Sequence, residues 1–190
     1  MKNTFPIPKL ENFDIFAFYE KAFSSVELEE IKKMFVEMTD GHVGHDGNVD
    51  RIIRKSKVKF IEKDEKTYWI FDKLSAFSFA CNSARWRFQL SGFYEGLQLT
   101  EYDEEGSHYD WHMDNGNGDM SIRKLSLILL LDDAKDYDGG ELGFLGIQDK
   151  KKYDAGTLIV FPSYVGHKVY PVTKGKRRTV VAWISGDPYR

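Results

Sequence analysis

The chain has 190 residues, a length typical of one domain of ordinary size. Its 27 basic and 30 acidic residues give a formal net charge of -3, which argues against a nucleic-acid partner because such proteins usually carry a net basic face. No apolar run approaches the about 20 residues of a membrane helix, and the N-terminus has no signal-peptide pattern. The single cysteine, Cys81, can form no intramolecular disulfide and is expected to be a buried core thiol. We therefore expect a cytoplasmic protein that binds neither nucleic acid nor membranes.

The first half of the chain is predicted to mix helices with strands. Ser24 and Glu27 have the spacing of a capping box, which opens a helix over LEEIKKMFVEM. A second helical pattern covers Lys66–Ala84. Between the two, the stretch Thr39–Asp50 is polar and contains Gly41, Gly44 and Gly47. Because it offers little apolar surface for packing, we expect it to be a mobile lid.

From Trp86 onward the sequence consists of strand-like runs separated by Gly, Asp and Lys turns. The runs are WRFQL, LQLTEY, KLSLILLLD, ELGFL, TLIVF, HKVYPV and RTVVAWIS. So many strands at short spacing favour a β-sandwich or barrel, with the front helices packed on the outside of one sheet. The prediction is one mostly β domain with flanking helices (α+β) over residues 1–190, made of a helical support over about 1–85 and a β core over about 86–190.

His112 and Asp114 are the first candidates for a metal site. On an extended strand, residues two apart point to the same face, so the imidazole and the carboxylate can approach one ion. The third ligand must come from elsewhere, and His167 is the histidine that follows further along the chain. Two histidines and one carboxylate form the facial triad of non-haem iron(II) oxygenases, which leaves metal positions free for a bidentate 2-oxo acid and for dioxygen. An H-x-D pair alone occurs by chance in many proteins, so the pattern needs support.

Arg177 provides that support, because it follows His167 by ten residues across a strand and a turn. The distal carboxylate of a 2-oxo diacid needs a fixed cation, and arginine offers a bidentate fork. The alternative interpretation is a solvated basic turn, because lysines and Arg178 lie beside it. The turn register decides whether Arg177 or Arg178 faces inward, and the residue pattern leaves both open.

A series of short motifs runs in unbroken order from about Gln98 to Pro188, roughly half of the chain. They are Gly106-x-x-Tyr109-x-x-His112-x-Asp114-Asn115, Arg123-Lys124-Leu125-Ser126, Tyr137-x-Gly139-Gly140-Glu141-Leu142, Phe161-Pro162-Ser163, His167-x-Val169-x-Pro171-Val172-Thr173-x-Gly175, and Arg177 with Trp183. In this order and spacing, the C-terminal half resembles the prolyl 4-hydroxylase-like branch of the 2-oxoglutarate/Fe(II) dioxygenase superfamily. The resemblance implies a double-stranded β-helix, a jelly-roll or cupin-like core.

The resemblance also implies roles for individual residues. His112, Asp114 and His167 would bind Fe(II), and Arg177 rather than Arg178 would hold 2-oxoglutarate. Tyr102 and Ser126 would line the co-substrate cavity, Ser126 on one strand face with Ile128 and Leu130. The chain departs from the family pattern at Leu130, where some relatives place a tyrosine, so the hydrogen bonding around the co-substrate must differ.

The activity implied is hydroxylation of an unactivated C–H bond, coupled to oxidative decarboxylation of 2-oxoglutarate by O2, with ascorbate as reductant. A peptide or protein proline is the first choice of substrate, and a free amino acid or other small molecule is the second. A rival of another class is a non-catalytic jelly-roll module with a structural metal. Arg177 separates the two, because a structural metal site needs no buried cation ten residues beyond its last ligand. The residue pattern leaves the oligomeric state open.

Overall fold

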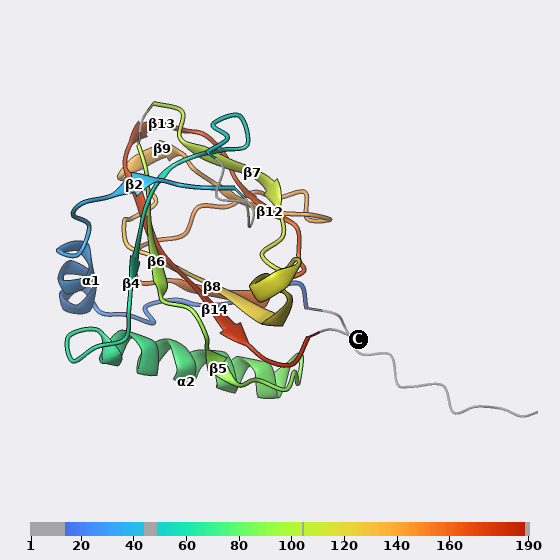
Figure 1. The fold of residues 1–190 in the computed structure, drawn as a ribbon. Coiled ribbons are helices and arrows are strands. Elements are labelled where there is room, and N and C mark those ends of the chain that lie inside the picture. The colour runs from blue at the N-terminus through green and yellow to red at the C-terminus, as the bar shows by residue number, and fades with distance from the viewer. Residues whose placement is uncertain (1–13, 44–48, 104, 189–190) are drawn as a thin grey trace, which may run out of the picture.

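A computed structural model describes residues 14–43, 49–103 and 105–188 (Figure 1). Over these ranges the chain is mostly β, with two α-helices and one short 3-10 helix, η1 (Gly118–Ile122). Its strands form an eight-stranded sheet, a four-stranded sheet and a two-stranded sheet. None of the helices in this part of the chain is both long enough and apolar enough to cross a membrane.

The eight-stranded sheet is antiparallel throughout. Its strand order is β1 (Ala17–Tyr19), β11 (Leu158–Pro162), β8 (Arg123–Leu130), β14 (Arg177–Ser185), β6 (Leu97–Tyr102), β4 (Lys57–Ile61) and β2 (Thr39–Asp40), and β5 (Gly92–Phe93) also pairs with β14. The segment before residue 85 thus supplies strands at both edges of this sheet as well as the helices.

The four-stranded sheet carries two of the candidate metal ligands on neighbouring strands. Its order is β10 (Leu142–Phe144), β12 (His167–Val169), β7 (His108–His112) and β3 (Arg54–Lys55), while β13 (Val172–Gly175) pairs with β9 (Tyr137–Gly139). His167 on β12 is directly opposite His112 on β7. The backbone register alone therefore places these two imidazoles side by side.

The central strands of the large sheet are buried on both faces, and their side chains alternate between two cores. On β8, Leu125, Leu127 and Leu129 enter one core, whereas Ile128 and Leu130 enter the other. The other central strands alternate in the same way: Val180, Ala182, Leu97, Leu99, Leu158 and Val160 join the first core, and Ile159 and Phe161 join the second. The second core also takes Phe144 and Val169 from the small sheet, so it lies between the two sheets.

The first core contains the buried apolar residues of both helices. Helix α1 (Ser25–Lys32) contributes Leu28 and Ile31, and α2 (Tyr68–Ala84) contributes Ile70, Phe71, Leu74 and Cys81. In Figure 1, α2 runs beneath the strands β8 and β14. The predicted capping box is present, because Ser24 accepts from the Glu27 amide and the Glu27 carboxylate accepts from the Ser24 amide. Cys81 is a free, buried thiol, as expected.

The predicted strand WRFQL is wrong. Residues 86–91 form no strand, because the Asn82 side chain accepts from the Phe88 amide and donates to the Phe88 carbonyl, both at 2.9 Å. These are the backbone groups that a neighbouring strand would otherwise pair. Arg87, the residue before Phe88, has a φ of +56°, which an extended strand does not allow.

Two other boundaries differ from the prediction. The run HKVYPV is two strands, β12 and β13, because Pro171 has no amide to continue the ladder. The first helix ends at Lys32 rather than continuing through the predicted LEEIKKMFVEM, and Glu37 takes a φ of +54° as the chain turns away. Residues 44–48 of the predicted lid lie outside the described residues.

Candidate metal centre and co-substrate cavity

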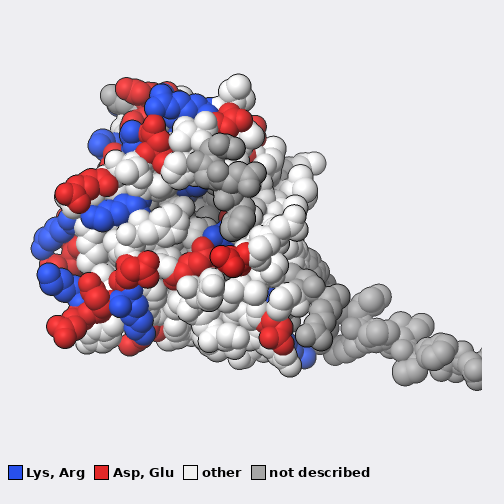
Figure 2. All heavy atoms as spheres, in the orientation of Figure 1, with Lys and Arg blue, Asp and Glu red and all other residues white. Residues whose placement is uncertain are grey.

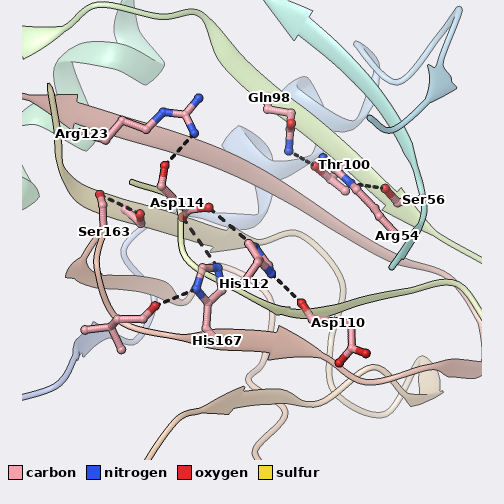
Figure 3. A network of polar contacts seen from close by, with 12 residues as sticks. Arg54, Ser56, Gln98, Thr100, Asp110, His112, Asp114, Arg123, Ser163 and His167 are labelled. Carbon is pink, nitrogen blue, oxygen red and sulfur yellow. Dashed lines mark hydrogen bonds and ion pairs between the residues drawn. The ribbon is translucent and has the colours of Figure 1, made fainter. Parts of the chain in front are cut away.

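His112, Asp114 and His167 are brought together by the fold. Each offers a ligand atom that lies within 4.8 Å of the other two, and they form the one such group of histidine, cysteine and acidic residues found across the described ranges. The Nε2 atoms of His112 and His167 lie 3.7 Å from the Asp114 carboxylate oxygens Oδ1 and Oδ2, respectively. The two imidazole ring centroids are 4.1 Å apart. Figure 3 shows the three side chains pointing toward one another.

Asp114 reaches this point by a bend rather than along a strand. Strand β7 ends at His112, and the Asp114 amide then donates to the Ser163 carbonyl at 3.0 Å. Arg123 donates from Nη1 to the Asp114 carbonyl at 3.0 Å, and its guanidinium also pairs with Glu95. The Asp114 backbone is therefore held on both sides, by Ser163 and by Arg123 (Figure 3).

Backbone carbonyls orient both imidazoles. The Nδ1 atom of His112 lies 2.7 Å from the Asp110 carbonyl oxygen, and that of His167 lies 3.1 Å from the Val165 carbonyl oxygen. Because a carbonyl oxygen only accepts, each Nδ1 must carry the proton, which leaves the Nε2 lone pair facing Asp114. Histidines that bind metals have this arrangement, with the second ring nitrogen held by a backbone or carboxylate acceptor.

The electrostatics of the cluster favour the protonation states that bind a metal. Burial lowers the pKa of the His112 imidazole, and His167 beside it lowers the pKa further. Burial opposes the charge on Asp114, but the adjacent His167 and His112 outweigh this effect and hold the pKa of the carboxyl below its usual value. Neutral imidazole and ionised carboxylate are the ligand forms that a divalent cation requires.

A cavity of about 460 Å³ extends from this cluster toward the large sheet. Its walls include the three clustered residues, the apolar side chains Val58, Phe60, Ile128, Val169 and Val181, and Tyr102, Thr179 and Trp183. Arg177 also lines it. In Figure 2, basic and acidic side chains intermingle on the outer face shown.

Arg177 and Arg178 have different environments. Arg177 is 1% exposed, and its Nε and Nη1 atoms have no hydrogen-bond partner among the residues described. Its guanidinium carbon lies 5.3 Å from the centroid of the Tyr102 ring, which is directly opposite on β6. Arg178 instead pairs with Asp132, at 2.6 Å from Nη2 to Oδ1. In the register of β14, the Arg177 side chain therefore lies in the cavity wall and the Arg178 side chain contacts Asp132.

The other two predicted cavity residues are placed differently from each other. Tyr102 is buried and lines the cavity. Ser126 is fully buried but is not among the cavity-lining residues, and its hydroxyl donates to the Ser163 hydroxyl at 3.0 Å. This hydrogen bond thus connects β8 to Ser163, the residue that follows β11, near the Asp114 bend.

Sequence reasoning missed two charged cavity residues, Arg54 and Arg123. Arg54, on β3, donates to the Ser56 hydroxyl and to the His42 carbonyl, and its Nη2 has no partner among the described residues. The Arg123 guanidinium lies 3.8 Å over the Trp183 ring. Arg123 belonged to a recognised motif, RKLS, but nothing around Arg54 in the sequence marks it as a cavity residue.

Comparisons with known proteins agree with this geometry. Residues 97–185 match the family model described as the 2OG-Fe(II) oxygenase superfamily. A PKHD-type hydroxylase of Synechococcus sp. (strain CC9902) is 41% identical over 88 residues, which cover 45% of this chain and 40% of that protein. A PKHD-type hydroxylase of Gloeothece citriformis is 41% identical over 85 residues, which cover 43% of this chain and 39% of that protein.

Among solved structures, a Pseudomonas putida prolyl-4-hydroxylase superposes with a TM-score of 0.72 at 20% identity, covering 91% of this chain and 93% of that one. A Trichoplax adhaerens prolyl hydroxylase, solved with a peptide fragment of the hypoxia inducible factor oxygen degradation domain, gives a TM-score of 0.74 at 20% identity and covers 90% and 83% of the two chains.

The fold is therefore that of the prolyl hydroxylases, and residues 97–185 match the model of the 2OG-Fe(II) oxygenase superfamily. This confirms the predicted resemblance, and the predicted set of Fe(II), 2-oxoglutarate and O2 is the one that this family uses. The matched stretch spans about two fifths of the length of the curated relatives.

Proposed function

We propose that the chain is a 2-oxoglutarate- and Fe(II)-dependent dioxygenase that hydroxylates an unactivated C–H bond. In this proposal His112, Asp114 and His167 hold the iron, and Arg177 holds the distal carboxylate of 2-oxoglutarate. One observation carries it: a single cavity contains a buried Asp114 oxygen without a hydrogen-bond partner and a buried arginine with two unpartnered N–H positions, within the part of the chain described. Unpaired buried polar atoms are rare, so two such groups in the wall of one cavity favour ligands bound there.

The residues present fit the two ligands that the family implies. A carboxylate with two imidazoles whose Nε2 lone pairs converge is a donor set for a divalent ion such as iron(II). A guanidinium in an otherwise mostly apolar wall fits one carboxylate of a small diacid. When bound, iron(II) would supply the coupling between decarboxylation of 2-oxoglutarate and oxygen insertion, with ascorbate as reductant. The chain's part is to position both ligands and, through the apolar walls, to exclude water.

The double-stranded β-helix expected for this family is supported by the arrangement of the strands. The large and small sheets share one core, and the cavity lies between them at the strands β6, β7, β12 and β14. The expected packing of the N-terminal helices is supported by the buried residues of α1 and α2 in the core on the other face of the large sheet.

For the substrate we propose a prolyl residue of a peptide or protein. The relatives and structural neighbours carry the support, because PKHD-type hydroxylases and prolyl hydroxylases recur among them and one neighbour was solved with a peptide. The rim of the cavity is consistent with a peptide, because Phe60 and Met113 line it and are half exposed. A free amino acid or other small molecule is the alternative.

The test is succinate release from 2-oxoglutarate by the full chain with Fe(II) and ascorbate in air, with and without proline-containing peptides. We expect succinate in excess of a His167→Ala control, together with a peptide that gains the mass of one oxygen atom. No succinate from wild type, although it binds iron, would favour the non-catalytic metal module. Succinate release stimulated by free amino acids but not by peptides would favour the small-molecule alternative.

A further inference from the structure

Tyr137 on β9 has a buried hydroxyl that the proposed site does not use. The residue is 1% exposed, and its hydroxyl has no hydrogen-bond partner among the residues that the structure describes. The Lys152 ammonium donates to the Tyr137 carbonyl at 2.8 Å and lies 5.1 Å from the centroid of its ring. The ring is therefore in a basic environment, while the hydroxyl itself is unsatisfied.

The hydroxyl lies beside the Arg177 guanidinium. Burial raises the pKa of the Tyr137 hydroxyl, and the adjacent Arg177 guanidinium partly offsets the rise. Gly140 permits this proximity: a Cβ at this position would lie 3.0 Å from Cδ of Arg177 and 3.1 Å from Cε2 of Tyr137, and its φ is +64°. The glycine therefore leaves room for the arginine and the tyrosine to pack against each other.

Together the two residues have more hydrogen-bond donors than acceptors. Arg177 contributes only donors, and two of them, Nε and Nη1, are buried and unpartnered. The tyrosine oxygen can accept one of these N–H groups, but its own proton then still needs an acceptor. The nearby Asp132 already binds Arg178, so it does not fill this role. An acceptor with several lone pairs, such as a carboxylate, would satisfy both the guanidinium and the hydroxyl.

We propose that Tyr137 is a co-substrate-binding residue, whose hydroxyl and the Arg177 guanidinium together bind the distal carboxylate of 2-oxoglutarate. This rests on the proposed function. It also accounts for the departure at position 130, where some relatives carry a tyrosine and this chain has a leucine. Leu130 and Tyr137 belong to the same core beside the cavity, so a hydroxyl absent from β8 is supplied from β9.

The test is Tyr137→Phe, which removes one oxygen and keeps the ring. Tyr153→Phe is the matched control, because Tyr153 packs against the same core without taking part in the site. Two probes are titrated into the iron-loaded, oxygen-free full chain, with the absorption of the iron chelate as the readout. One is 2-oxoglutarate; the other is 2-oxopentanoate, which ends in a methyl group instead of the distal carboxylate.

We expect Tyr137→Phe to weaken 2-oxoglutarate binding by about 10- to 150-fold, the usual effect of losing a hydrogen bond to a charged group. Binding of 2-oxopentanoate should not change, and Tyr153→Phe should match wild type with both probes. Equal 2-oxoglutarate affinity in wild type and Tyr137→Phe overturns this inference alone, and so does an equal loss for both probes, which would mean general damage to the site. If wild type binds iron but not 2-oxoglutarate, both this inference and the proposed function fail.

Discussion

Arg177 and Arg178 are neighbours on strand β14, yet the alternation of the strand places one in the cavity wall and the other against Asp132. The Asp132 carboxylate accepts from the Arg178 amide at 2.7 Å and from its guanidinium at 2.6 Å. This contact ties the end of β8 to the beginning of β14 and leaves Arg177 facing inward. The two arginines therefore allow a matched pair of substitutions.

Arg177→Ala is expected to spare metal binding and to weaken 2-oxoglutarate binding strongly. It would leave the distal carboxylate desolvated and unpaired, a loss that typically costs about 2–5 kcal/mol, or roughly 30- to several-thousand-fold in affinity. Arg177→Lys should be milder, because the charge stays and the planar fork is lost. The measurement is titration of 2-oxoglutarate into the iron-loaded protein without oxygen. Unchanged affinity in Arg177→Ala would remove this residue from the site.

Arg178→Ala should show the opposite pattern, with 2-oxoglutarate affinity close to that of wild type and a lower free energy of unfolding. It leaves the buried Asp132 carboxylate without its bidentate partner, and Lys32, at 3.6 Å, replaces only part of the interaction. A cost of about 1–3 kcal/mol is expected for such an unsatisfied group. Urea denaturation of both variants measures it. If Arg178→Ala had wild-type stability but bound 2-oxoglutarate poorly, Arg178 rather than Arg177 would face the cavity.

Removal of the metal should lower thermal stability in wild type and have no effect in His167→Ala. A ligand that binds only the folded state at about 100 times its dissociation constant adds about 2.7 kcal/mol. His108→Gln is the control, because His108 lies on the same strand as His112 but outside the triad. The measurement is the melting temperature with and without Fe(II), Zn²⁺ or Ni²⁺, and with a chelator. A metal-dependent shift that persists in His167→Ala would place the ion elsewhere.

Asn82→Ala is expected to destabilise the fold by about 1–3 kcal/mol, because it removes two hydrogen bonds, one to the Phe88 carbonyl and one from the Phe88 amide. Ser83→Ala, an exposed position on the same helix, should stay within about 0.5 kcal/mol of wild type. Both values come from urea denaturation. If the two variants were equally stable, the Asn82 contacts would not be what holds residues 86–91 out of the sheet.

The sequence predicted those elements whose signals are local. The capping box at Ser24, the helical stripe of α2 and the apolar run Leu125–Leu131 each needed only neighbouring residues to be recognised. The three clustered residues could be named from spacing and family resemblance. What the residue pattern left open depends on partners distant in sequence: Arg178 is fixed by Asp132, 46 residues earlier.

The same limit explains the remaining differences. The run WRFQL has strand composition, but one side chain of the preceding helix takes up the backbone groups of Phe88. Arg54 comes from a short strand with no motif around it, and it enters the cavity because β3 pairs with β7 beside the triad. Neither the contact of Asn82 with Phe88 nor the pairing that places Arg54 in the cavity produces a periodic pattern in the sequence. Each depends on a segment that is irregular or distant along the chain.

Because side chains alternate along the large sheet, the same strands carry two sets of residues. One set is selected for the stability of the core and the other for what fits the cavity. Leu127 and Ala182 face the helices, whereas Ile128 and Val181 face the cavity. Substitutions at the second set can change which molecules fit while the helix-facing core stays intact, so a lineage could acquire new substrates without first losing its fold. An engineer could likewise vary the cavity-facing positions of β8 and β14 as a library and expect most members to remain folded.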